Sequence, residues 1–184
     1  MARVEILRGD ALPEAARETY ETAVSYGPFA SLAGAMAQRP PILNNVFGLL
    51  DDLRDEGVLD RRSLELALVA VSKLNACDYC VAHHSPMLHV VGASAEAIAN
   101  ILDYENVDEF DEKDRLVIEY AQAVTVDANR VRDGVFERLR EHFSEPQIVE
   151  LTWRIALCGA FNRFNDVLQL DIEADAQAAM ENVA

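Results

Sequence analysis

The chain has 184 residues, of which 51% are hydrophobic and 26% are charged. That is enough apolar sequence for one domain with a hydrophobic core, and the low content of 8 glycines and 6 prolines excludes a disordered or fibrous chain. The 16 basic and 32 acidic residues give a formal net charge of −16, so we expect neither nucleic-acid binding nor docking on anionic lipid.

The sequence contains no apolar run of the roughly 18 residues that a membrane span requires. Residues 1–18 also lack an apolar run of signal-peptide length and include acidic residues early. We therefore expect a cytoplasmic protein that does not enter a membrane. The 3 cysteines are too few for a secreted disulfide scaffold.

Nearly every stretch of the chain is typical of a helix. Val, Ile and Thr form no alternating runs bounded by Asn-Gly or Asp-Gly, so no hairpin is expected. No linker or change in composition marks a second domain, and residues 1–184 are expected to form a single, compact, multi-helix all-α domain. Breaks between helices are predicted at Pro28, at Pro40 and Pro41, around Gly57, near Asn75, at Gly92, between Asn106 and Asp111, near Asp133 and at Ser144.

Three helix starts are recognisable from their capping residues. Asp60 precedes a predicted helix over residues 61–74, and Ser94 precedes an Ala-rich turn. Ser144 is followed by a proline in the first turn and by Gln147 at the capping-box position. These caps predict where three helices begin.

The distribution of apolar residues predicts which helices are buried. Residues 64–74 are apolar on nearly every side, with Glu65 as the exception, so they are expected to form a central buried helix that leads into the cysteine-bearing helix. Residues 148–161, with Trp153 among their apolar side chains, are expected to form a second core helix. Residues 116–124 are amphipathic and are expected to flank the core.

Cys77 and Cys80 form a Cys-x-x-Cys pair, followed at once by His83 and His84. Positions three and four apart share a helix face, so Cys77, Cys80 and His84 are expected to line one stripe. A break near Asn75 places both thiols in the first turn of a new helix, where free N–H groups and the helix dipole favour a thiolate. A second thiol within reach closes a disulfide once the first is oxidised to sulfenic acid.

Glu65 is a buried carboxylate in this prediction, which is costly unless it has a proton to share or a partner. If the helix over residues 61–74 folds back on the helix that follows it, Glu65 reaches His84. The pair then relays a proton.

Structural interpretations of the same residues remain open. In the first interpretation, the spacing of the two cysteines is accidental or serves only the structure. In the second, a zinc ion is bound by two Cys, one His and a carboxylate. Because the second distant ligand pair of a structural zinc site is missing, we expect no metal and no cofactor. His83 is expected to be a solvated or loosely packed neighbour rather than a second catalytic base, and Cys158 a small core residue. The polar run over residues 162–166 is expected to be a solvated or interface face, with a place beside the thiols as the alternative.

The series Glu65, Cys77, Cys80 and His84 resembles the alkylhydroperoxidase D-like group of the carboxymuconolactone decarboxylase family, most strongly over residues 60–92. The resemblance implies an all-α fold that assembles into homo-oligomers, often trimers or hexamers. It also implies thiol-dependent reduction of hydrogen peroxide or organic hydroperoxides without haem, flavin or metal. The oxidised enzyme then needs a dithiol protein or a lipoyl-type carrier as reductant.

The resemblance also assigns roles by position. Cys80 attacks the peroxide and Cys77 resolves the sulfenic acid as a disulfide, whereas the helix start alone favours Cys77 as the nucleophile. His84 and Glu65 form the proton relay. The family's best-known peroxidases carry a second His where this chain has Tyr79, a poor base at neutral pH. Tyr79 and His83 are therefore accessory candidates.

Two other functions stay open at this point. A lactone or keto-acid decarboxylase of the same family is one, although such relatives usually lack the cysteine pair. The other is a non-catalytic oligomeric binding or redox-sensing protein, in which the dithiol only reports the redox state.

Overall fold

The structure is a computed structural model that describes residues 1–183, and within this range every regular element is a helix. The predicted all-α fold is therefore confirmed. The α-helices are α1 (Arg17–Tyr26), α2 (Ala30–Met36), α3 (Pro40–Glu56), α4 (Arg61–Leu74), α5 (Asp78–Val90), α6 (Ala95–Ala99), α7 (Glu112–Asp127), α8 (Asp133–His142), α9 (Glu145–Leu168) and α10 (Ala174–Glu181). Short 3₁₀ turns are η1 (Gly9–Ala11), η2 (Glu14–Ala16), η3 (Ile101–Asn106) and η4 (Ala128–Arg130). None of the helices in this range is both long enough and apolar enough to cross a membrane.

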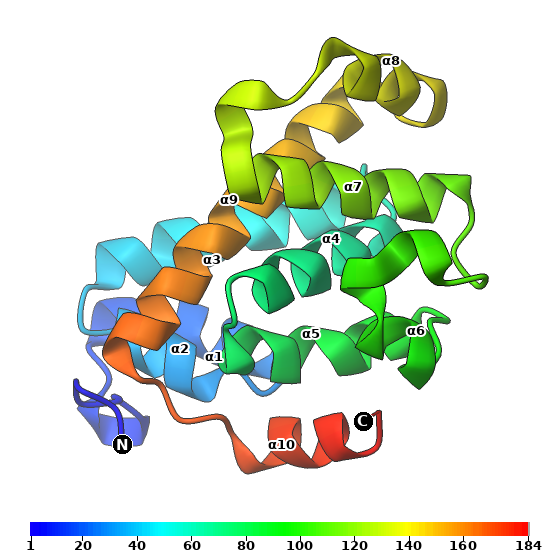
Figure 1. The fold of residues 1–184 in the computed structure, drawn as a ribbon. Helices are drawn as coiled ribbons and strands as arrows, with labels where there is room; N and C mark the ends of the chain where they lie inside the picture. The colour runs from blue at the N-terminus through cyan, green and yellow to red at the C-terminus, as the bar shows by residue number, and fades with distance from the viewer. Residues whose placement is uncertain (184) are drawn as a thin grey trace.

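Helix α4 lies at the centre of the fold, in contact with α5, α7 and α9 (Figure 1). Its start is fixed by Asp60, whose carboxylate accepts a hydrogen bond of 2.9 Å from the backbone N–H of Ser63. Leu66, Val69 and Val71 have no exposed surface. The prediction of a central buried helix is confirmed. The predicted caps Ser94 and Ser144 also stand directly before α6 and α9.

A tight connection joins α4 to α5. Ala76 adopts a left-handed conformation with φ of 53°, and the next residue, Cys77, is extended and precedes the first turn of α5. The backbone N–H of Cys77 donates to the carbonyl of Ser72 at 3.0 Å, which closes the connection. Because Cys77 stands outside the helix, the spacing that predicted a single stripe applies only to Cys80 and His84.

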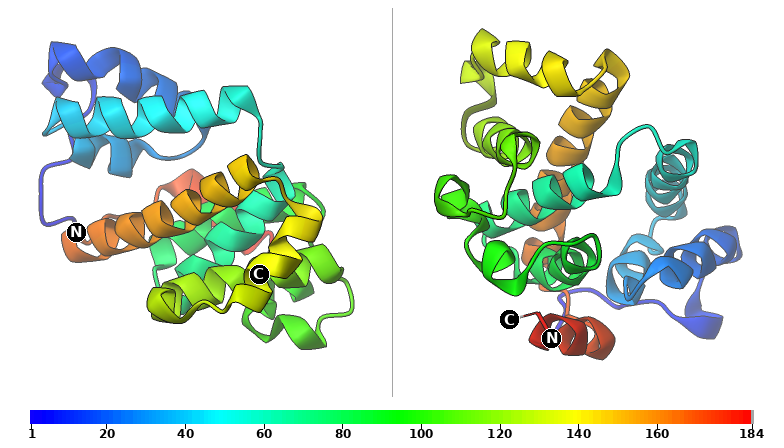
Figure 2. Two further views of the ribbon diagram at one scale, coloured as in Figure 1. Left: turned by 90° about the horizontal axis from the view of Figure 1, so that it is seen from above. Right: turned by 90° about the vertical axis from the view of Figure 1, so that its right-hand side faces the viewer.

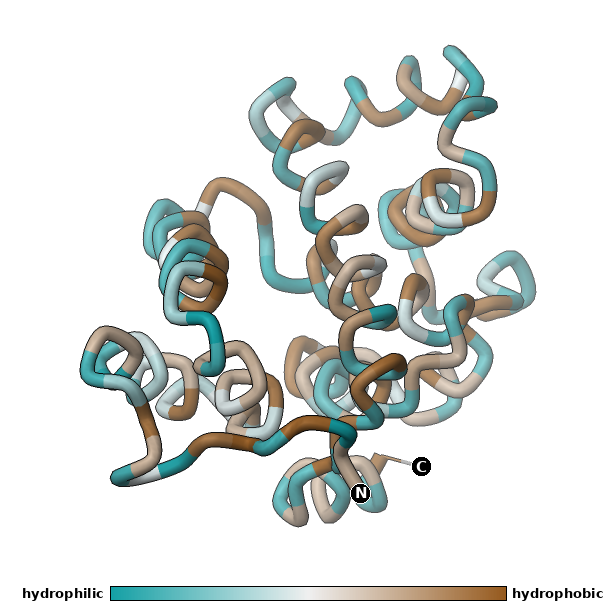
Figure 3. Tube along the Cα trace, turned by 90° about the vertical axis from the view of Figure 1, so that its left-hand side faces the viewer, coloured by the Kyte–Doolittle hydropathy of each residue, from teal (hydrophilic) through white to brown (hydrophobic). Residues whose placement is uncertain are grey.

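Helices α1 to α3 form a layer beside the bundle that contains α4, α5, α7 and α9 (Figures 2 and 3). Each part has its own apolar cluster. The cluster of the N-terminal layer includes Leu32 and Leu43 from α2 and α3, and it also takes in Cys77, Tyr79 and Cys80 from the start of α5. The cysteine pair therefore lies where the two parts meet.

Helix α9 is longer than the predicted core segment 148–161 and is buried on a different face. Leu151, Ile155 and Cys158 point into the core, whereas Trp153 is 49% exposed. Trp153 stands two positions after Leu151, which places it on the opposite side of a helix. The expectation that Trp153 belongs to the core was wrong for this reason.

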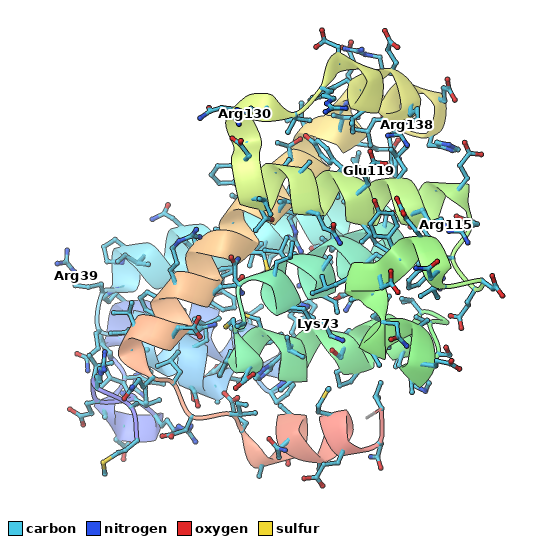
Figure 4. The ribbon with its side chains drawn as sticks, in the orientation of Figure 1. Arg39, Lys73, Arg115, Glu119, Arg130 and Arg138 are labelled. Atoms are coloured by element: carbon cyan, nitrogen blue, oxygen red, sulfur yellow. The ribbon has the colours of Figure 1, made fainter. Side chains whose placement is uncertain are left out.

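Two peripheral helices complete the structure. Helix α8 is joined to α7 by an ion pair of 2.6 Å between Arg138 and Glu119 (Figure 4). Helix α10 packs along α5 (Figure 1), so the C-terminal segment folds back over the cysteine-bearing helix. Residue 184 lies outside the described residues.

Candidate functional site

A cavity of about 500 Å³ lies between the N-terminal layer and helices α4, α5 and α9. Most of its wall is apolar, with Phe29, Phe47 and Phe161 among the lining residues. Cys80 and His84 also line it. The cavity thus joins a thiol and an imidazole to a space that suits an organic molecule.

Cys80 occupies the wall of this cavity and is only 5% exposed. The side-chain amide of Asn165, in α9, donates a hydrogen bond of 3.2 Å to the sulfur of Cys80. A donor aimed at sulfur stabilises the negative charge of a thiolate. Cys80 therefore combines access to the cavity with a fixed donor for its charged form.

Cys77 is fully buried and does not line the cavity. Its hydrogen bond with Cys80, its burial and the neighbouring Asp166 all raise the pKa of the Cys77 thiol. This thiol stays protonated and lies against its partner. The two cysteines thus differ in access to the cavity, which favours Cys80 as the nucleophile. The position at the helix start alone had favoured Cys77.

Glu65 and His84 are joined across the α4–α5 turn. The Oε2 atom of Glu65 lies 2.8 Å from Nδ1 of His84, and its Oε1 atom accepts a hydrogen bond of 2.8 Å from Nε of Arg61. Glu65 is 2% exposed, and burial raises its pKa. His84 and Arg61 together lower the pKa by more than burial raises it, so the net pKa lies below the usual value. Glu65 is therefore ionised at neutral pH.

An ionised carboxylate accepts hydrogen bonds only, so Nδ1 of His84 carries the proton that Glu65 accepts. The other ring nitrogen, Nε2, has no hydrogen-bond partner among residues 1–183. His84 lines the cavity, so this nitrogen is available as a base. The proton relay predicted for Glu65 and His84 has the hydrogen bond it requires.

His83 is buried, at 3% exposure, and the expectation that it is a solvated neighbour was wrong. Its Nδ1 atom lies 2.6 Å from the carbonyl of Tyr79, and its Nε2 atom lies 2.9 Å from Oε2 of Glu173 and 2.7 Å from the carbonyl of Pro28. The ring stacks between Phe29 and Tyr79, at centroid distances of 5.0 Å and 4.2 Å. The C-terminal segment that carries Glu173 is what covers it.

Both ring nitrogens of His83 face acceptors, which favours the doubly protonated imidazolium. Burial lowers the pKa of His83, but the bonds to Glu173, Tyr79 and Pro28 outweigh that effect, and the net pKa is raised. His83 is therefore a fixed hydrogen-bond donor in this structure. Its nitrogens are already occupied, unlike Nε2 of His84.

Tyr79 belongs to the same network as His83. Its hydroxyl donates to Oε1 of Glu173 at 3.0 Å and accepts from the backbone N–H of Leu32 at 3.3 Å. Burial and the nearby Glu173 carboxylate raise the pKa of Tyr79 above its usual value, so its phenol stays neutral. Tyr79 links α5 to α2 and to the C-terminal segment.

Two further residues complete the site, and of these only Asn165 falls in a segment that the sequence singled out. Glu173 accepts from Tyr79, from His83 and from the backbone N–H of Ser31. Nothing in its local sequence indicates this role. Asn165 lies in the polar run 162–166, and a buried polar residue within an apolar helix was the available signal.

The expectation that the polar run 162–166 is a solvated or interface face was wrong for Asn162 and Asn165, which are both buried, whereas the alternative of a place beside the thiols holds for Asn165. Asn162 accepts a hydrogen bond of 2.8 Å from the side chain of Asn75, and Asn165 contacts Cys80. Cys158 is a small buried residue, as expected, with the Ser72 hydroxyl 3.5 Å from its sulfur. Within residues 1–183, no three His, Cys, Asp or Glu side chains are grouped so that they could hold a metal ion.

Comparison with known proteins finds a family model and relatives that match part of this chain. Residues 40–123, which run from α3 into α7, match the model of the carboxymuconolactone decarboxylase family. The uncharacterized protein YdfG of Bacillus subtilis is 26% identical over 108 residues, which cover 58% of this chain and 74% of YdfG.

Solved structures share the fold over almost the whole chain. An AhpD-core, peroxidase-related protein of uncharacterized function from Ralstonia eutropha has a TM-score of 0.83 at 23% identity, covering 96% of this chain and 94% of that one. The debrominase Bmp8 has a TM-score of 0.76 at 20% identity, covering 97% and 96%.

These structures show that the chain has an AhpD-like all-helical fold. The family model matches residues 40–123, the part of the chain that carries Glu65, Cys77, Cys80 and His84, and this agrees with the resemblance seen in those four residues.

Proposed function

We propose that the chain is a thiol-dependent peroxidase that reduces organic hydroperoxides through a Cys77–Cys80 disulfide cycle. One observation carries the proposal: Cys80 and His84 line one cavity, with an amide donor on the sulfur and an ionised Glu65 behind the imidazole. Nucleophile, base and orienting carboxylate are the parts that covalent catalysis requires.

The first half of the reaction consumes the peroxide. Nε2 of His84 takes the thiol proton of Cys80, and the thiolate attacks the terminal peroxide oxygen. The S–O bond forms as the O–O bond breaks, and the leaving alkoxide takes the proton back from His84 as an alcohol. Cys80 becomes a sulfenic acid.

The second half restores the thiols. The Cys77 sulfur attacks the sulfur of Cys80, an S–S bond forms, and the hydroxyl of the sulfenic acid leaves as water after accepting the Cys77 proton. The sum is hydroperoxide plus dithiol giving alcohol, water and disulfide. A dithiol protein or a lipoyl-type carrier then reduces the disulfide by exchange in the cytoplasm.

The size of the cavity favours an organic substrate over hydrogen peroxide. It holds about 500 Å³ and is largely apolar, whereas a water-sized molecule needs about 30 Å³. A small polar peroxide would leave most of the apolar wall without a partner. An alkyl or aryl hydroperoxide fills it.

The test is stopped-flow consumption of cumene hydroperoxide by the reduced protein, with thiols counted before and after. Wild type is expected to lose two thiols per chain, and peptide mapping is expected to find Cys77 bonded to Cys80 rather than to Cys158. The Cys80→Ser variant is expected to be inactive, and Cys77→Ser to accumulate a sulfenic acid that dimedone traps. Full turnover by Cys80→Ser would overturn the proposal.

Other outcomes point to other functions. Activity on a lactone or keto acid that survives iodoacetamide indicates the lyase. A disulfide that forms reversibly without turnover under any dithiol reductant indicates a redox sensor. Homo-oligomer formation, in trimers or hexamers, belongs to the same proposal and is measured by sedimentation.

A second candidate is the reduction of a carbon–halogen bond, favoured by the fold shared with the debrominase Bmp8 and by the apolar cavity beside Cys80. The two thiols supply the electrons for this reaction as well. An organic bromide and two thiols give the product with a C–H bond, a disulfide and hydrogen bromide. Bromide release from a bromopyrrole, measured beside peroxide consumption, distinguishes the two.

A further inference from the structure

Arg154 lies in the wall of the cavity, on α9, and is partly buried. Its guanidinium makes no hydrogen bond or ion pair with any group of residues 1–183. Five N–H donors and a positive charge in a largely apolar wall are costly without an acceptor. Burial accordingly lowers the pKa of Arg154.

The other charged residues of the cavity wall are already paired, with one exception. Arg54 bonds Asp51 at 2.7 Å, and Arg61 bonds Glu65 at 2.8 Å. Asp60 is held by Lys113 at 2.7 Å. Each of these three carboxylates is bonded to another cation, and none of them forms an ion pair with Arg154.

The exception is Glu150, one helical turn before Arg154. The two side chains form no ion pair, and Glu150 instead receives a hydrogen bond from the backbone of Leu59. Burial raises the pKa of Glu150, and the nearby Arg154 lowers it by less. The positive charge of Arg154 therefore faces the cavity without a bound counterion.

We propose that the cavity binds an amphipathic organic carboxylate, with its carboxylate on Arg154 and its apolar chain against Phe29, Phe47 and Phe161. A guanidinium pairs with a carboxylate through two parallel N–H donors, which gives both affinity and a fixed orientation. The cation and the apolar wall then recognise the two ends of one molecule.

The reach of the cavity sets the shape of this molecule. Arg154 and Asn165 stand eleven positions apart on α9, which is roughly 16 Å along the helix axis, and Asn165 contacts Cys80. A ligand whose carboxylate binds Arg154 therefore has the other end of its alkyl chain near Cys80. The substrate class is a fatty-acid hydroperoxide with its peroxide remote from its carboxylate. This last step rests on the peroxidase function proposed above, whereas the binding of the carboxylate does not.

The binding experiment uses decanoate and 1-decanol as probes, titrated into the full chain and followed by calorimetry. Wild type is expected to bind decanoate at least tenfold more tightly than 1-decanol. Arg154→Gln is expected to lose that tenfold preference and Arg154→Lys to keep part of it. Arg130→Gln changes an exposed arginine of η4 (Figure 4) and is the matched control, with binding as in wild type.

Thermal unfolding of each variant shows that it is folded before the titration is interpreted. Equal binding of decanoate and decanol by wild type would overturn the inference. So would unchanged decanoate binding in Arg154→Gln, or no decanoate binding at 1 mM.

The activity experiment compares a fatty-acid hydroperoxide with its methyl ester. Arg154→Gln is expected to raise the KM for the acid at least tenfold, with kcat changed less than twofold and the ester unaffected. If decanoate binds but neither peroxide is consumed, the peroxidase function fails and the carboxylate site stands. If both peroxides are consumed with equal KM by wild type, the peroxidase function stands and this inference fails.

Discussion

Glu65 and His84 are 19 positions apart in the sequence, and a hydrogen bond of 2.8 Å joins them between two successive helices. The bond exists because Ala76 turns the chain through a left-handed conformation, so that α5 runs back along α4. A buried carboxylate in a central helix thereby fixes which nitrogen of the imidazole carries a proton.

The Glu65→Gln variant tests the use of this bond. The Gln amide oxygen can still accept from Nδ1–H, but it carries no negative charge to support the imidazolium of His84, so we expect peroxide consumption to fall about 100-fold. Stopped-flow assays measure the rate. Glu105→Gln, on an exposed 3₁₀ turn, is the control and is expected to behave as wild type. A Glu65→Gln variant with half the wild-type rate would exclude the relay.

Asn165→Ala tests the donor on the Cys80 sulfur. Loss of a hydrogen bond that stabilises a thiolate is expected to slow alkylation of Cys80 by iodoacetamide at pH 7 about tenfold, equivalent to about 1.4 kcal/mol. Asn165→Asp places an acceptor beside the sulfur and is expected to be slower still. Mass spectrometry of the labelled peptide follows the rate at Cys80 alone. Asn106→Ala, in an exposed turn, is the control.

The pair of His83 and Glu173 makes the stability of the fold depend on pH. The raised pKa of His83 gives stability that is fully present below about pH 6.5 and is lost as pH rises through the folded-state pKa. The lowered pKa of Glu173 gives stability that is present above about pH 4.3 and is lost as pH falls. The pair therefore stabilises the protein most between these values.

Glu173→Gln tests this dependence. We expect it to cost about 1–3 kcal/mol at pH 6, because the buried His83 imidazolium loses its counterion. The cost is expected to shrink toward pH 9, as His83 of the wild type deprotonates. Urea unfolding at several pH values measures both. A difference that stays constant between pH 6 and pH 9 would contradict the assignment.

Ala76→Gly is expected to stabilise the protein by about 1 kcal/mol, because Ala76 is exposed and has a left-handed φ of 53° that costs about 1–2 kcal/mol for a residue with a Cβ. Ala178→Gly, at an exposed position within α10, is the matched control and is expected to destabilise by about 1 kcal/mol. Urea unfolding distinguishes the two signs.

Local signals in the sequence predicted the helices and the centre of the fold. Asp60, Ser94 and Ser144 indicated helix starts because capping depends on residues within one turn. The apolar run 64–74 indicated burial for the same reason. The hydrogen bond between Glu65 and His84 was predictable because both residues belong to one helical hairpin.

The rest of the site depends on contacts that no local signal encodes. Asn165 meets Cys80 across 85 positions of sequence, and Glu173 meets His83 across 90. The buried state of His83 follows only once the C-terminal segment has folded over α5. The prediction for Trp153 was wrong because burial depends on which face of the helix meets the core, and Trp153 lies on the face opposite Leu151.

The cysteine pair is also part of the packing between the two layers of the protein, since Cys77 and Cys80 share an apolar cluster with Leu32 and Leu43. A covalent change at either sulfur is therefore expected to change how tightly the N-terminal helices pack against the bundle. Thermodynamic coupling is reciprocal. For the disulfide proposed above, a variant that weakens this packing therefore also shifts the reduction potential of the pair, so its melting temperature and its redox midpoint are expected to change together.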